Sequence, residues 1–181
     1  MEKTLDRIGW TAKWRIDKFH DPTDQLAREM QNGMPTKQAR SLHGEAFLGS
    51  EEFTCNLALN EGLGELIDLI CGLGTPAPWD STNARIGVGD SDTEAAATQT
   101  GLQAETNKTF KAMDSTYPQR TNQTVEWRAT FGSSEANYPW EEYTVVNAAN
   151  DTGKNLNRKV SSKGTKAAGE TWTLSLQITF S

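Results

Sequence analysis

The residues best suited to chemistry are three carboxylates that alternate along one short segment, Asp90-Ser-Asp92-Thr-Glu94. Alternating carboxylates can present several oxygens to a hard cation such as calcium. A calcium loop of the EF-hand type also needs glycine at its sixth position and glutamate at its twelfth, where this chain has Ala95 and Gly101. Acidic residues are also common in solvated turns. We therefore predict no metal site, and we interpret the segment as a surface loop.

Other catalytic arrangements also lack essential parts. The same carboxylates could form the acid pair of a glycosidase, but no cleft signature accompanies them. The two histidines, His20 and His43, lie in a polar N-terminal stretch without a partner motif. Gly87 and Gly89 supply two glycines of a dinucleotide fingerprint, but Asp92 occupies the third position, where a negative charge repels pyrophosphate. With no zinc, thiol-redox, serine-hydrolase or phosphate-loop motif, the sequence predicts a non-enzymatic protein without a cofactor.

Tryptophan offers a further kind of chemistry, because its ring can stack on sugars, and the chain has six. Trp79 and Trp140 lie near predicted turns and are candidate ligand-facing aromatics. Trp127 and Trp172 alternate in phase with apolar strand residues, so we predict that they belong to the core. A module that binds host-surface carbohydrate is therefore an open alternative.

Length and charge narrow the class of protein. The 181 residues suit one domain with an extension, and the net charge of −6 argues against a nucleic-acid partner, since Lys and Arg supply most affinity for phosphate backbones. No apolar window has signal-peptide or membrane-span length, so we expect synthesis in a cytoplasm and no membrane partner. Cys55 and Cys71 are expected to be reduced, partly buried thiols.

The elements that must position these residues are mostly strands. Thr171–Phe180 has the clearest pattern, because bulky apolar residues occupy one face while Thr, Ser and Gln occupy the other. Similar alternation predicts strands at residues 84–89, 108–112, 125–131, 140–146 and 156–160.

One short helix is predicted after Asn60. Leu63, Leu66, Ile67 and Ile70 fall on one of its faces, and Gly72 and Gly74 end it. The predicted fold class is mainly β, an antiparallel β-sandwich or jelly-roll-like domain over residues 56–181 with this one short helix.

Residues 1–55 have a different pattern. Trp10–Ile16 alternates as a half-buried strand would, but residues 20–50 are mostly polar with scattered glycine and proline. Ordering costs about 1–2 kcal/mol per backbone residue, which so few apolar side chains cannot offset alone. We therefore predict an extended N-terminal arm that orders on a neighbouring subunit. The candidate interface residues are its apolar members: Trp10, Trp14, Ile16, Phe19, Phe47 and Phe53.

The order of several segments over residues 56–181 resembles virion proteins of tailed bacteriophages, in particular tail-collar or fibre-type domains and structural proteins of head-and-tail gene clusters. No single motif decides the resemblance, which rests on the sequence of segments along one short chain. These segments are residues 56–62, 84–91, 98–102, 128–132, 136–143 and 156–160, followed by the closing alternating strand.

The resemblance implies a β-rich module that forms a homo-oligomer, such as a trimer, on the virion. It implies the major capsid protein or tail and collar proteins as partners, and it carries over no catalytic residue. A capsid decoration (cement) protein is favoured over a tail, collar or fibre component, because the chain is short and lacks a long repetitive shaft.

Overall fold

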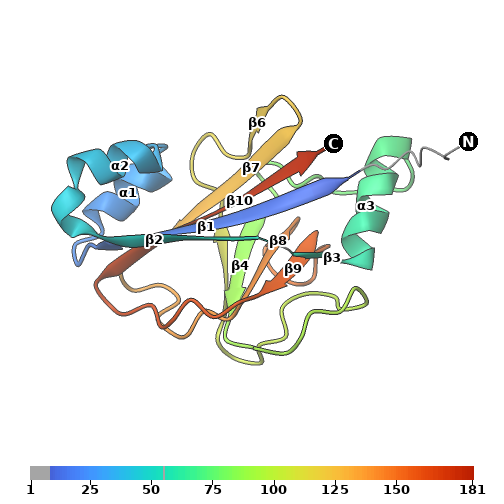
Figure 1. Ribbon diagram of the computed structural model, residues 1–181. Coiled ribbons are helices and arrows are strands. Elements are labelled where there is room, and N and C mark those ends of the chain that lie inside the picture. Colours follow the sequence, from blue (N-terminus) through green and yellow to red (C-terminus); the bar gives the residue numbers. More distant parts are fainter. Residues whose placement is uncertain (1–8, 55) are drawn as a thin grey trace, which may run out of the picture.

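A computed structural model describes residues 9–54 and 56–181, and it contains two five-stranded antiparallel sheets that pack face to face (Figure 1). This confirms the predicted mainly-β fold and its sandwich character. All of the predicted strands of residues 84–180 are present, with bounds that differ by at most two residues.

The first sheet has the order β2-β1-β10-β7-β6. At its centre, β1 and β10 pair antiparallel along eleven residues each, from Trp10↔Phe180 to His20↔Glu170. The bounds of its strands are β1 Trp10–His20, β2 Phe47–Thr54, β6 Gln119–Thr121, β7 Thr124–Phe131 and β10 Glu170–Phe180.

The second sheet has the order β3-β9-β8-β4-β5. Its central strand β8 is buried along its whole length, because it lies between two neighbours and faces the first sheet. The bounds of its strands are β3 Leu57–Ala58, β4 Arg85–Gly89, β5 Lys108–Ala112, β8 Glu142–Val146 and β9 Asn157–Val160.

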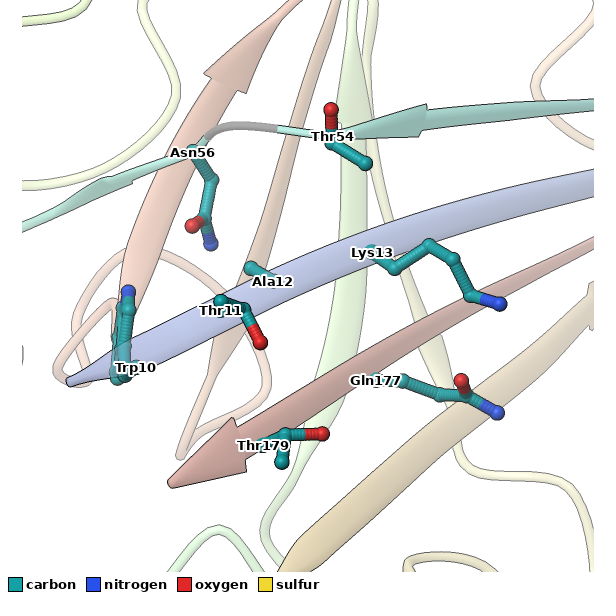
Figure 2. Close-up of a pocket in the computed structure, with 8 residues that line it drawn as sticks. All are labelled: Trp10, Thr11, Ala12, Lys13, Thr54, Asn56, Gln177 and Thr179. Carbon is teal, nitrogen blue, oxygen red and sulfur yellow. The ribbon is translucent and has the colours of Figure 1, made fainter. Parts of the chain in front are cut away.

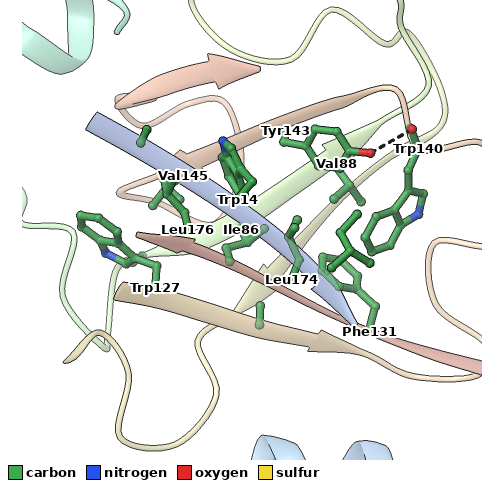
Figure 3. Packing of buried hydrophobic residues seen from close by; sticks show 14 of the residues in the cluster. Trp14, Ile86, Val88, Trp127, Phe131, Trp140, Tyr143, Val145, Leu174 and Leu176 are labelled. Carbon is green, nitrogen blue, oxygen red and sulfur yellow. Dashed lines mark hydrogen bonds between the residues drawn. The ribbon is translucent and has the colours of Figure 1, made fainter. Parts of the chain in front are cut away.

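Aromatic and aliphatic side chains from both sheets fill the space between them (Figure 3). Trp14, Tyr143 and Leu174 are fully buried in this core. The Tyr143 hydroxyl donates a hydrogen bond of 2.9 Å to the Trp140 carbonyl, which removes the cost of burying that hydroxyl (Figure 3). Trp127 and Trp172 are 6% and 2% exposed, so their predicted place in the core is confirmed.

The prediction of an N-terminal arm outside the β-domain is wrong. β1 and β2 belong to the first sheet, and β1 hydrogen-bonds with strands on both of its sides. Trp14, Ile16 and Phe19 are fully buried, and Phe53 is 9% exposed. The local composition could not reveal this arrangement, because the segment obtains its apolar partners from β10, which lies some 150 residues later in the chain.

The predicted helix is present as α3 (Asn60–Cys71), which follows Leu59 and ends at Gly72 in the left-handed conformation, φ 64°. Two further helices, α1 (Gln25–Gln31) and α2 (Thr36–Leu42), and a 3₁₀ turn at Gly44–Ala46 were not predicted. The sequence signal was weak because each helix has seven residues and together they bury only four side chains: Leu26, Ala27, Met30 and Ala39.

Candidate functional site

An open groove of about 690 Å³ lies at the end of the first sheet, where β2 leaves β1 (Figure 2). β2 pairs with β1 from Lys13↔Thr54 onward, whereas Asn56 already leads into β3 of the second sheet. The groove therefore marks the crossing of the chain between the sheets. Its described lining residues are Trp10, Thr11, Ala12, Lys13, Thr54, Asn56, Gln177 and Thr179.

The strand register determines which backbone groups face this groove. Gly9 and Ser181 exchange two hydrogen bonds, of 2.7 and 2.9 Å, so hydrogen-bonded pairs between β1 and β10 recur at every second residue from there. The N–H and C=O groups of Thr11 thus point toward β10. Those of Trp10 and Ala12 point to the opposite side, where the groove lies.

The side chains of the groove are suited to hydrogen bonding. Thr11 lies opposite Thr179, and Lys13 lies opposite Gln177, so these four side chains share the outer face of the sheet. The buried Asn56 Nδ2 has no hydrogen-bond partner among the described residues. Hydroxyls, amides and one ammonium group can bind a polar extended chain. The described lining includes no histidine, cysteine or carboxylate that could act as a base or nucleophile.

The acidic loop is held by structural contacts. Asp90 Oδ2 accepts a hydrogen bond of 2.7 Å from Asn107, and Arg158 donates one of 2.8 Å to the Thr93 carbonyl. Within residues 9–54 and 56–181, no three His, Cys, Asp or Glu side chains gather in a way that could hold a metal ion. Gly87 and Gly89 lie in β4, where an added Cβ would come within 3.0 Å of neighbouring side chains, so packing explains both glycines.

The two candidate sugar-binding tryptophans are buried. Trp140 has no exposed surface and donates a hydrogen bond of 2.9 Å to the Ala136 carbonyl. Trp79 is 7% exposed and bonds the Lys154 carbonyl at 3.1 Å. The prediction that Trp140 faces a ligand is therefore wrong, because its ring lies in the core. Trp79 is also mostly buried, but it borders a largely apolar hollow of about 360 Å³ beside Pro118 and Phe180.

The candidate interface residues are likewise mostly internal. Trp14, Ile16 and Phe53 belong to the core between the sheets, and Phe19 belongs to a smaller buried cluster with Leu26, Met30 and Ala39. They therefore cannot contact a neighbouring subunit in the folded chain. Phe47 is partly buried against Phe19, with ring centroids 5.4 Å apart. Trp10 borders the groove, while its ring packs edge-on against Phe180.

Buried charges are the main feature that the sequence did not reveal. Glu142 is fully buried and accepts hydrogen bonds from Arg158 Nε at 2.8 Å and from the backbone N–H groups of Gln103 and Ala104 at 2.8 and 2.7 Å. These bonds attach the loop after β4 to the second sheet. Only the three-dimensional partners of such charges reveal that they are buried.

A second buried pair joins Arg128 to Asp114 at 2.8 Å, and Arg128 also donates to the Met30 carbonyl of α1. Burial raises the pKa of Asp114 above its usual value, against the lowering effects of Arg128 and Thr130.

Lys166 is fully buried, and desolvation lowers its pKa to about 8. Its Nζ donates to the Gly132 carbonyl and to Asn137 Oδ1 at 2.7 and 2.8 Å. These contacts join loops to the sandwich.

The outer side of α3 presents apolar residues to solvent. We call Leu63, Ile67, Ile70 and Leu73 the α3 face, and their exposed fractions are 40, 56, 76 and 54%. The sequence had grouped Leu66 with three of them, but Leu66 packs on the core.

Cys71, expected to be partly buried, is an exposed free thiol, and Cys55 lies outside the described residues.

Comparisons with known proteins give no assignment. No protein-family model, no curated protein sequence and no solved structure matches the chain. Over the described residues, no helix has the length and apolar content needed to cross a membrane.

Proposed function

We propose that this chain is a non-enzymatic structural protein of a tailed bacteriophage particle, a capsid decoration protein that binds the shell as a homo-oligomer. The observation that carries the proposal is the exposed α3 face. Isolated apolar side chains are common on protein surfaces, but a contiguous exposed group of them marks a contact with another protein. A subunit that forms a homo-oligomer on a shell needs such a surface, and a sandwich with buried ion pairs supplies a rigid body that carries it.

The segments that resemble phage virion proteins support the proposal through their place in the fold. Residues 128–132 and 156–160 contribute Arg128 and Arg158, which form the two buried ion pairs, and residues 136–143 contribute Glu142 and Trp140. The segments that carry the resemblance thus contain residues that stabilise the β-sandwich. The burial of Trp79 and Trp140 argues against the alternative of a carbohydrate-binding module.

The test is the location and copy number of the chain in purified phage particles, measured by quantitative mass spectrometry and by electron microscopy of particles with a tagged chain. We expect many copies, distributed over the shell in a fixed ratio to the major capsid protein. A dozen copies or fewer at one vertex would instead indicate a collar, tail or fibre component. Absence from particles would contradict the proposed function.

A further inference from the structure

We infer that a second copy of this chain covers the α3 face, so that two α3 helices pack antiparallel across a twofold axis beside Ile67. The inference deepens the proposed function, and it rests on that proposal only for the claim that this face is a contact surface. α3 lies at one edge of the molecule, opposite the α1 and α2 pair, so a second copy can reach it (Figure 1).

The two sides of α3 differ in what they contact. On its inner side, Leu66 and Leu69 pack against the core. Gly62 approaches the segment just before β9 so closely that an added Cβ would lie 2.6 Å from Asn155 O and Leu156 Cα. The side chains of the α3 face point the other way, and Ile70, at 76%, is the most exposed of the large apolar residues described.

The end of the helix extends the apolar surface. The N–H groups of Gly72 and Leu73 both bond the Asp68 carbonyl, which is the pattern of a helix that ends in a left-handed glycine. In such an ending, the residue after the glycine lies beside the side chains of the last full turn. Leu73 therefore continues the row that Leu63, Ile67 and Ile70 begin.

Two of the three acidic side chains of α3 are turned away from this row, and the third, Asp68, is partly buried beside Ile67. Glu61 Oε1 accepts hydrogen bonds from the backbone N–H and the side chain of Asn155, and Glu65 Oε1 accepts them from Ala77 N–H and Asn147. Both carboxylates are thereby held against the body of the subunit. A partner selected by charge would need basic groups opposite exposed acids, whereas an uncharged apolar row is complementary to itself.

Gly64 provides separate support. It lies within the helix on the outer side, and no heavy atom lies within 4 Å of an added Cβ. Glycine is unfavourable inside a helix relative to alanine. The described part of the subunit gives no packing reason for it, in contrast to Gly62. A second helix that approaches closely would supply the reason, because the missing side chain lets two backbones come together.

The area of the α3 face is sufficient for a dimer. At their observed exposures its four side chains present roughly 400 Å² of apolar surface. Apolar atoms make up about 60% of a typical interface, so two such faces with their polar rims would bury roughly 1,300 Å² when all four side chains are fully covered. Specific interfaces bury about 1,200–2,000 Å² in total.

A twofold axis packs the α3 face of one copy against the α3 face of the second copy. In an antiparallel pair centred beside Ile67, Leu63 of one copy lies against Ile70 of the second copy, and the reverse contact forms by symmetry. Ile67 then faces the row of the second copy near the axis. Both copies use the same surface, so the assembly closes at two subunits on this face.

The first experiment measures the mass of the full chain in solution by sedimentation equilibrium. The parent should be a dimer at micromolar concentration, and Ile67→Glu should raise its dissociation constant at least 100-fold, because the variant places two carboxylates near the axis. Leu42→Glu is the matched control, since Leu42 is 62% exposed at the end of α2 and should leave the constant unchanged. A monomeric parent at 100 µM, or equal weakening by both variants, overturns the inference.

The second experiment tests the geometry by disulfide cross-linking. With both native cysteines replaced by serine, Ile67→Cys should form an intermolecular disulfide under mild oxidation, and Leu42→Cys should not. Failure of Ile67→Cys to cross-link overturns the antiparallel pairing. A monomer that still enters phage particles overturns the dimer alone, whereas a dimer absent from particles overturns the proposed function alone.

Discussion

The buried charged residues under the loops and the exposed α3 face both reverse the usual distribution of side chains. Arg158, Glu142 and Lys166 are fully buried, while Ile67 and Ile70 are more than half exposed. The buried charges are tolerated because Glu142 and Lys166 each have several protein partners. The exposed aliphatic side chains have no comparable partners within the described subunit. Polarity alone therefore does not determine burial in this chain, and the unpartnered apolar groups form the surface on which we propose that a second copy binds.

The largest expected effect comes from removing β1. A chain that begins after His20 loses a strand paired on both sides, together with the buried Trp14 and Ile16. We expect no cooperative unfolding transition in urea, followed by circular dichroism. A truncated chain that keeps the cooperative transition of the parent would show that the N-terminal segment is dispensable and would restore the arm hypothesis.

Breaking a buried ion pair should come next. Arg158→Met leaves Glu142 buried without its charged partner, so we expect the free energy of unfolding to fall by about 3–5 kcal/mol. Arg120→Met is the matched control, because Arg120 is exposed, and its effect should stay within about 0.5 kcal/mol. Similar losses in both variants, measured by urea denaturation, would mean that the Arg158 pair has no special role.

Lys166 predicts a pH dependence of stability. Its pKa is about 8 in the folded chain and 10.5 without perturbation, so between these values the unfolded chain binds more protons. The free energy of unfolding should therefore rise with pH in this window, by about 2 kcal/mol between pH 7.5 and 10. Lys166→Met should lack this contribution when compared with the parent at each pH. A constant difference between the two proteins across the window would contradict the lowered pKa.

The smallest effect is expected on the α3 face. Ile70→Ala, measured at a concentration where the chain is monomeric, should change the free energy of unfolding by less than about 0.5 kcal/mol, because the side chain is 76% exposed. Leu174→Ala in the core should cost about 2–5 kcal/mol under the same conditions. A large loss at Ile70 would show that the face stabilises its own subunit.

The sequence predicted those parts of the fold that local patterns encode. The alternation in Thr171–Phe180 and Val125–Phe131 determined strand phase, since a residue that faces the opposite sheet must be apolar. The local pattern of Trp10–Ile16 was equally clear, but its assignment to an arm was wrong because β1 obtains its partners from the distant β10. Local composition carries no information about such pairing.

The surfaces were less predictable than the fold. The sequence located the apolar residues of α3 but could not show which side of the helix faces the core, because Leu66 and Leu69 on one side and Ile67 and Ile70 on the other are all apolar. The groove beside Trp10 arises where β2 leaves β1, which depends on the register of three strands. Trp79 and Trp140 showed that proximity to a turn does not imply exposure.

The most direct test of the contact surface compares exposed aliphatic residues within one sample by hydroxyl-radical footprinting. Oxidation of Leu63, Ile67 and Ile70 is measured by mass spectrometry in dilute and in concentrated protein, with Leu42 and Leu48, 62 and 54% exposed, as internal references. We expect oxidation of the α3 face to fall at least threefold on concentration while both reference residues stay unchanged. Equal oxidation of the α3 face at both concentrations would contradict the account.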